Sequence, residues 1–213
     1  MTAIAVVDYG MGNLRSVSKA IEHVAPDAEV RVTSNPADIA AAERVVFPGQ
    51  GAMRDCMREM DARGLRPALL VAARTKPFLG ICIGLQMLFE HSEEGGGVAG
   101  LGVLPGQVRR FPAEAMRDAQ GERLKVPHMG WNNVHHAHEH ALWADIADAE
   151  RFYFVHSYYV ETNVKEFVAG STDYAFPFTC AVARDNIFAV QFHPEKSHTA
   201  GLQLLSNFVS WNP

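Results

Sequence analysis

The stretch Gly80-Ile81-Cys82-Ile83-Gly84-Leu85-Gln86 decides how the fold of this chain is interpreted. Lys76-Pro77-Phe78-Leu79 before it has the character of a buried strand end, and apolar residues after it recur at helical spacing as far as His91. These patterns predict a tight strand-to-helix turn with Cys82 at its tip and a glycine two residues away on each side. Such a turn presents a nucleophile to the unpaired N–H groups at a helix start, which favour a thiolate. The motif is short, so a small buried core cysteine explains Cys82 equally well when it is taken alone.

Length, composition and charge limit the class of protein. The chain has 213 residues, of which 48% are hydrophobic, and a net charge of -5. We therefore expect residues 1–213 to bury one large core as a single domain. The net negative charge and the lack of a run of basic residues argue against a nucleic-acid partner. No apolar run approaches the roughly 20 residues that cross a membrane.

The amino-terminal segment and the cysteines indicate a cellular compartment. The first eight residues lack the charged region of a signal peptide. Three widely spaced cysteines match no zinc-binding pattern and leave at least one thiol free. These features predict a reduced, cytoplasmic protein.

An alternation of apolar strands and helical patterns predicts a doubly wound α/β fold in the first ninety residues. Residues 3–7 and 45–47 are continuous apolar runs, as expected of parallel strands buried on both faces, and residues 29–33 alternate like a strand nearer the edge. The expected fold is an open, mostly parallel sheet with helices on both faces. From about residue 103 the pattern changes, and short strands of an added antiparallel or mixed portion are predicted at residues 103–111, 123–134, 151–160, 167–174 and 179–183.

Two glycine-rich turns follow apolar strands. Gly10-Met11-Gly12 lacks the third glycine of a dinucleotide-binding loop, so we expect no nucleotide cofactor there. Pro48-Gly49-Gln50-Gly51 leaves backbone N–H groups uncovered and able to adopt unusual φ values. An oxyanion hole requires such groups. An ordinary glycine turn into a helix explains the second stretch as well.

The last apolar strand, residues 187–192, runs into His193-Pro194-Glu195-Lys196. The proline disfavours helical backbone at His193, and residues two apart in an extended chain project to the same side. Glu195 can therefore orient the imidazole of His193, although a surface His–Glu pair is the plainer alternative. In a doubly wound sheet this segment and the Cys82 turn lie at the same carboxyl edge. Together they supply the parts of cysteine-based acyl transfer.

Three further features have a structural explanation. Pro127-His128-Met129-Gly130-Trp131-Asn132 suits a partner-contact loop or a packed turn, and composition alone favours the turn. Residues 135–140 are rich in histidine, but no second ligand cluster accompanies them, so we expect no metal site. Cys56 shares helical spacing with nearby methionines and is interpreted as an inert core residue.

The Cys82 turn and His193-Pro194-Glu195 resemble the class I, triad-type glutamine amidotransferases. Within this family, the chain is similar over essentially its whole length to the glutaminase subunits of histidine biosynthesis. The stretches that carry this similarity are Asp8-Tyr9-Gly10-Met11-Gly12-Asn13, Pro48-Gly49-Gln50-Gly51, Pro127-His128-Met129-Gly130-Trp131-Asn132 and His193-Pro194-Glu195-Lys196. The third is the most specific of them. Ile83 departs from the leucine that the family usually has, and Gln50 occupies a variable position.

The resemblance implies a reaction and its residues. Cys82 would attack the side-chain amide of L-glutamine, His193 would transfer the proton, and Glu195 would orient His193. Backbone N–H groups would hold the oxyanion, one from Ile83 and one from Gly49, Gln50 or Gly51. Gln86, Gly49 and Ser157 would bind the amino-acid end of the substrate.

The resemblance also implies a partner. Ammonia would pass to a separate (β/α)₈ synthase subunit, which makes imidazole glycerol phosphate and aminoimidazole carboxamide ribonucleotide. The residues placed near this partner are Pro127, His128, Met129, Gly130, Trp131, Asn132, Tyr153 and Lys196. Alternatives stay open: a glutaminase subunit for another acceptor, such as a pyridoxal phosphate, anthranilate or aminodeoxychorismate synthase; a stand-alone cysteine hydrolase; or a non-enzymatic interaction protein.

Overall fold

The computed structural model describes residues 2–213. The helices in this part of the chain are α1 (Leu14–Val24), α2 (Pro36–Ala41), α3 (Met53–Ala62), α4 (Arg66–Thr75), α5 (Ile83–Met87) and α6 (His198–Ser210). The strands are β1 (Ala3–Val7), β2 (Glu29–Thr33), β3 (Arg44–Gly49), β4 (Phe78–Cys82), β5 (His91–Ser92), β6 (Val98–Ala99), β7 (Gln107–Arg110), β8 (His128–His136), β9 (Glu150–His156), β10 (Tyr158–Glu161), β11 (Val168–Tyr174), β12 (Phe176–Arg184) and β13 (Ile187–Val190). Short 3₁₀ turns are η1 (Glu94–Gly96), η2 (Ala141–Trp143), η3 (Lys165–Phe167) and η4 (Pro194–Lys196).

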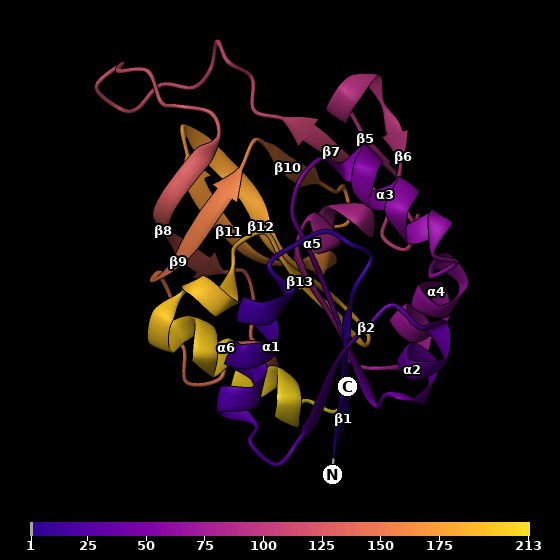
Figure 1. The fold of residues 1–213 in the computed structure, drawn as a ribbon. Coiled ribbons are helices and arrows are strands. Elements are labelled where there is room, and N and C mark those ends of the chain that lie inside the picture. Colours follow the sequence, from indigo (N-terminus) through magenta and orange to yellow (C-terminus); the bar gives the residue numbers. More distant parts are fainter. Residues whose placement is uncertain (1) are drawn as a thin grey trace.

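One sheet organises the molecule, with the strand order β2-β1-β3-β4-β13-β12-β10-β7-β5-β6. The strands from β2 to β13 are parallel. The remaining pairs are antiparallel, apart from the parallel pair β5–β7, and β11, β8 and β9 branch from β12. Helices α1 and α6 lie on one side of the parallel strands, and α2, α3 and α4 on the other (Figure 1). The predicted fold class is confirmed.

The centre of the parallel sheet is buried and mostly apolar. Every residue of β3, β4 and β13 is buried, which explains why these strands are continuous hydrophobic runs. The parallel register places Gly49 beside Cys82, and β13 lies on the other side of β4. The carboxyl ends of these three strands therefore meet at one edge of the sheet, where open α/β folds bind ligands.

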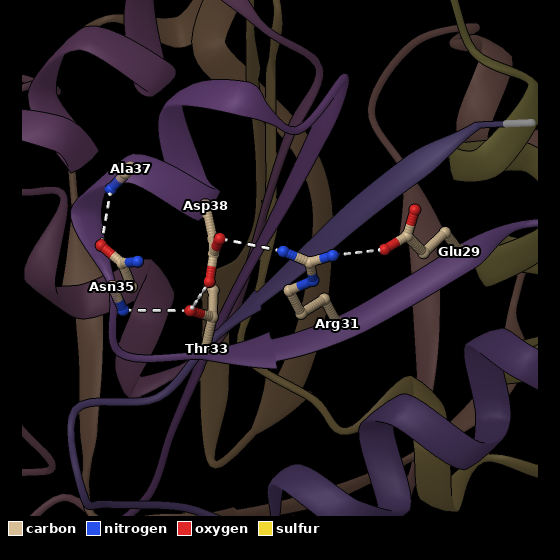
Figure 2. Close-up of polar contacts among 6 residues, drawn as sticks. All are labelled: Glu29, Arg31, Thr33, Asn35, Ala37 and Asp38. Atoms are coloured by element: carbon tan, nitrogen blue, oxygen red, sulfur yellow. Dashed lines mark hydrogen bonds and ion pairs between the residues drawn. The ribbon is translucent and has the colours of Figure 1, made fainter.

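Strand β2 is the edge of the parallel sheet, and polar contacts tie it to α2 (Figure 2). The Asn35 side chain caps α2 by accepting from the N–H of Ala37 at 3.0 Å. Asp38 accepts from the Thr33 hydroxyl at 2.7 Å and from the Arg31 guanidinium at 2.9 Å. Because charged side chains cover this edge, it is a poor template for pairing with another strand.

The helix after the Cys82 turn is shorter than predicted, and this prediction was wrong. Helix α5 ends at Met87 instead of continuing to His91, and all its residues are buried. The Met87 carbonyl accepts from the N–H of Leu101, and the Leu88 carbonyl accepts from the N–H groups of Val103 and Leu104. These carbonyls are therefore unavailable to continue the helix.

The added strands occupy the predicted part of the chain with different bounds. The segment at residues 103–111 contains only β7, and that at 123–134 becomes strand at His128 and extends to His136. The segment at 151–160 divides at Ser157 into β9 and β10. Pro127-His128-Met129-Gly130-Trp131-Asn132 is thus neither a loop nor a packed turn, because five of its six residues pair with β9.

Candidate active site

Cys82 occupies a strained strand-to-helix turn between β4 and α5, as its motif predicts. Its φ is 56° and its ψ is -110°, a backbone conformation that side chains other than glycine rarely adopt. A Cβ atom at Gly84 would lie 1.8 Å from the Phe47 carbonyl oxygen, and one at Gly80 would lie 2.9 Å from the Ala189 Cβ. The two glycines are therefore required because the turn packs directly on β3 and β13.

His193 and Glu195 form a buried pair close to Cys82. The Nδ1 atom of His193 lies 2.8 Å from Oε1 of Glu195, so Nδ1 carries the proton and Nε2 faces away from the carboxylate. Burial alone lowers the pKa of His193, but the negative charges of Cys82 and Glu195 outweigh it and raise this pKa to about 10. Among residues 2–213, Nε2 of His193 has no hydrogen-bond partner. That nitrogen is available for proton transfer.

Cys82 and His193 line the same cleft, which we call the Cys82 cleft. Its volume is about 320 Å³, a size that suits a small ligand. The predicted site residues Gln50, Gly51, Ile83, Gln86 and Ser157 also line it. Gly49 does not line the cleft but is buried beside Cys82 in the β3–β4 pair. Five further residues line the cleft: Glu94, Pro127, Val155, His156 and Tyr158. Of these, Pro127 was predicted near the partner, and only Glu94 lies outside the stretches that the sequence singled out.

Two side chains anchor the predicted oxyanion segment at residues 49–51. The Tyr9 hydroxyl donates to the Pro48 carbonyl at 2.8 Å, and the Cys56 thiol donates to the Gln50 carbonyl at 3.4 Å. Burial raises the pKa of Cys56 to about 11, so the thiol keeps its proton at neutral pH. These contacts hold the carbonyls on both sides of the Gly49–Gln50 peptide. Cys56 is thus the inert core residue that the sequence predicts, and its hydrogen bond also anchors the Gln50 carbonyl.

Gln191 is a site residue that the sequence analysis missed. Gln86 Nε2 donates to the Tyr158 carbonyl at 3.1 Å and to Gln191 Oε1 at 3.0 Å. Gln191 Nε2 in turn donates to the Cys82 sulfur at 3.7 Å. The sequence does hold a signal, because Gln191 is a polar residue inside an otherwise apolar strand run.

A buried histidine pair lies at the wall of the Cys82 cleft, which His156 lines. His156 Nδ1 donates to the Tyr158 carbonyl at 2.8 Å, which leaves His156 Nε2 to accept from His128 Nδ1 at 3.0 Å. Burial lowers the pKa of His156 to about 3 and that of His128 to about 4, so both rings are neutral at pH 7. The His128 side chain faces inward and is only 3% exposed, so its predicted place near a partner stays a prediction.

Other predicted partner residues lie together on β8, β9 and η4. Met129 is 62% exposed. Trp131 lies opposite Tyr153 in the β8–β9 register, contacts its ring edge-on and stacks on His198 at 4.8 Å. Lys196 Nζ lies 5.9 Å from the centre of the Tyr153 ring. We call Met129, Trp131, Tyr153 and Lys196 the aromatic patch.

Residues 2–213 contain neither a metal-binding cluster of side chains nor a membrane-spanning helix. Nowhere in these residues do three or more His, Cys, Asp or Glu side chains converge as a metal ion would need. None of the helices within the same range combines the length and the apolar character required to cross a membrane.

Sequence and structural comparisons identify the family. The model of the family described as glutamine amidotransferase class-I matches residues 5–211. The chain belongs to the class-I glutamine amidotransferases. It is 71% identical over 210 residues to imidazole glycerol phosphate synthase subunit HisH of Thiobacillus denitrificans, covering 99% of this chain and 92% of that protein. It is 67% identical over 213 residues to the subunit of the same name from Nitrosospira multiformis, covering 100% of both chains.

One solved structure with low sequence identity resembles this chain in its fold, and it bears only on the fold. The structure of PurLQS from Thermotoga maritima aligns with a TM-score of 0.68 at 16% identity, covering 98% of each chain. The family match over residues 5–211 confirms the resemblance that the Cys82 turn and His193-Pro194-Glu195 carry.

Proposed function

We propose that this chain hydrolyses L-glutamine to glutamate and ammonia and delivers the ammonia to a (β/α)₈ synthase subunit. That partner would make imidazole glycerol phosphate and aminoimidazole carboxamide ribonucleotide in histidine biosynthesis. The observation that carries the proposal is the convergence of Cys82, at a strained turn, and the buried His193–Glu195 pair on one cleft. Relatives named imidazole glycerol phosphate synthase subunit HisH, 71% and 67% identical, favour this acceptor over the other synthases considered.

The chemistry follows from the protonation states at the site. The raised pKa of His193 favours an imidazolium beside a Cys82 thiolate. The thiolate attacks the amide carbon of glutamine and forms a carbon–sulfur bond, and the carbonyl becomes an oxyanion. His193 protonates the leaving ammonia as the carbon–nitrogen bond breaks, which leaves a γ-glutamyl thioester. Neutral His193 then takes a proton from water, which attacks the thioester and releases glutamate and the thiolate.

Backbone N–H groups would stabilise the tetrahedral intermediate. The N–H of Ile83 belongs to the first turn of α5, where helical N–H groups have no partner within the helix. A second donor would come from residues 49–51. Tyr9 holds the carbonyl before the Gly49–Gln50 peptide, and Cys56 holds the carbonyl after it. We assign Gln86, Ser157 and Gly49 to the amino-acid end of the substrate. Gln86 and Ser157 line the cleft, which supports their assignment directly.

A partner subunit fits the position of the aromatic patch. Pro127 lines the Cys82 cleft, and β8 with its exposed Met129 begins at the next residue. The His193 N–H donates to the Tyr153 carbonyl at 2.9 Å, so the patch is also joined to the catalytic segment. A subunit docked on the patch would cover the cleft and receive ammonia there. Such transfer is needed because free ammonia at neutral pH is mostly ammonium, which is a poor nucleophile.

The test is glutamine hydrolysis by the purified chain, measured alone and with the (β/α)₈ subunit and its nucleotide ligand. We expect slow hydrolysis by the chain alone, because the Gly49–Gln50 peptide turns its N–H toward the oxyanion only when partner and ligand are bound. We expect much faster hydrolysis by the liganded complex. Equal rates in the two samples would refute this activation. No hydrolysis in either sample would refute the proposed function.

A further inference from the structure

Gln191 is a fully buried amide beside the proposed nucleophile. Its side chain has no exposed surface. A buried amide destabilises the fold unless its polar atoms have hydrogen-bond partners. Here the partners are two site residues from distant parts of the chain: Gln86 Nε2 at 3.0 Å from Gln191 Oε1, and the Cys82 sulfur at 3.7 Å from Gln191 Nε2.

The Tyr158 carbonyl fixes the orientation of both amides. This carbonyl can only accept, so the Gln86 atom 3.1 Å from it must be the NH₂ group. The second N–H of that group points at Gln191, which must therefore present its carbonyl oxygen. Gln191 Nε2 is then directed toward the Cys82 sulfur and donates to it. Reversing either amide would bring two acceptors or two donors together.

The same orientation leaves one polar atom of Gln86 without a partner among residues 2–213. Gln86 Oε1 is buried and has no hydrogen-bond partner among residues 2–213, while Gln86 itself lines the Cys82 cleft. An acceptor oxygen left unpaired at a ligand site suits an N–H donor of the ligand. The amino group and the side-chain amide of glutamine both carry such donors.

We propose that Gln191 is a positioning residue of the glutaminase reaction. It donates an N–H to the Cys82 sulfur, which stabilises the thiolate and holds it in the cleft. It also holds Gln86 with its carbonyl oxygen turned toward the substrate. Gln191 thus links the nucleophile and the residue that recognises the substrate. This inference rests on the proposed glutaminase function and adds a residue to it.

The test uses Gln191→Met, which keeps the length of the side chain but removes both hydrogen bonds. Gln191→Asn is the second variant, because it keeps an amide that is one methylene too short to span both partners. Thr172→Val is the matched control. Thr172 is a fully buried residue of β11, and its hydroxyl has no partner among the described residues.

Two measurements report on different parts of the proposal. The first is kcat and KM for glutamine, measured on the complex with the synthase subunit and its ligand. The second is the rate of Cys82 alkylation by iodoacetamide as a function of pH, measured on the full chain and assigned to Cys82 by mass spectrometry. Alkylation requires neither glutamine nor the synthase. It therefore tests the sulfur contact even if the proposed function fails.

We expect Gln191→Met to lower kcat/KM roughly tenfold to a hundredfold, the effect of losing one hydrogen bond to a charged group. The midpoint of the alkylation profile should move to higher pH, because the thiolate loses a donor. Gln191→Asn should shift both quantities in the same directions, and Thr172→Val should change neither.

An unchanged alkylation profile in a folded Gln191 variant would overturn the proposal, whatever happens to turnover. So would kcat/KM within twofold of wild type in both variants. If the wild-type complex does not hydrolyse glutamine but the alkylation midpoint still moves, the glutaminase proposal fails and the Gln191–Cys82 contact stands.

Discussion

His193 Nδ1 lies 2.8 Å from Glu195 Oε1, and the two side chains are only 2% and 1% exposed. A carboxylate that is buried this completely destabilises the fold unless a charged or polar partner offsets it. The partner here is the imidazole of His193, which lines the Cys82 cleft. Its other nitrogen, Nε2, has no hydrogen-bond partner among residues 2–213. The geometry therefore favours a role for the pair in proton transfer over a surface contact.

Glu195→Gln should reduce kcat of the glutaminase roughly 10²- to 10⁴-fold, the range observed for general acid–base groups and their orienting carboxylates. Loss of the negative charge lowers the pKa of His193 from its value of about 10. Since the imidazolium must donate a proton, the alkaline limb of the kcat/KM profile should move to lower pH. The measurement is the pH profile of the liganded complex. An unshifted alkaline limb would show that Glu195 does not act through His193.

Local patterns predicted those parts of the site that are encoded within a few residues. Glycines around Cys82 and the proline after His193 fix backbone geometry where they stand, and apolar runs identify strands buried on both faces. Features that depend on distant partners were missed or misjudged. Helix α5 stops at Met87, whose carbonyl accepts from the N–H of Leu101, and Gln191 contacts side chains 105 and 109 positions earlier. The inward direction of the His128 side chain was not predicted, because it depends on the β8 register.

Gly49→Ala should severely impair folding or glutaminase activity. An added Cβ would lie 2.0 Å from the Tyr9 hydroxyl oxygen and 3.1 Å from the Ile83 Cβ. Tyr9→Phe alone removes one buried hydrogen bond to Pro48 and should cost about 1 kcal/mol of unfolding free energy. Combined with Gly49→Ala, it should recover part of the loss by removing the clashing oxygen. Urea unfolding of the two single variants and the double variant measures this. Strict additivity would show that Tyr9 and Gly49 are not coupled.

Acid should destabilise the fold through His140, which lies away from the Cys82 cleft. Burial lowers the pKa of His140 from 6.5 to about 4. Between these values the unfolded chain binds a proton that the folded chain does not, so His140 favours folding fully above about pH 6.5 and progressively less toward pH 4. Because the ring is partly exposed and solvent screens its charge, His140→Asn should remove roughly 1–2 kcal/mol of this pH dependence.

The measurement is the urea midpoint between pH 7 and pH 4, with His23→Asn as the control because His23 is an exposed residue of α1. An identical pH dependence in His140→Asn and wild type would contradict the assignment of this acid sensitivity to His140.

Met129→Lys should weaken binding to the synthase subunit at least tenfold, because it places a hydrated charge at an exposed apolar position of the aromatic patch. Val71→Lys is the matched control. Val71 is 59% exposed, against 62% for Met129, but it lies on α4, away from β8 (Figure 1). Calorimetric titration of both variants with the synthase subunit measures the difference. Equal dissociation constants would place the interface elsewhere.

The most direct measurement compares glutamine-dependent and ammonia-dependent synthesis by the complex that carries Cys82→Ser. The hydroxyl of serine is far less acidic than a thiol, and His193 and Glu195 are arranged to pair with a thiolate. We predict that glutamine-dependent synthesis falls at least roughly 10³-fold while synthesis from added ammonia stays within twofold of wild type. Glutamine-dependent synthesis near the wild-type rate would contradict a nucleophilic role for Cys82.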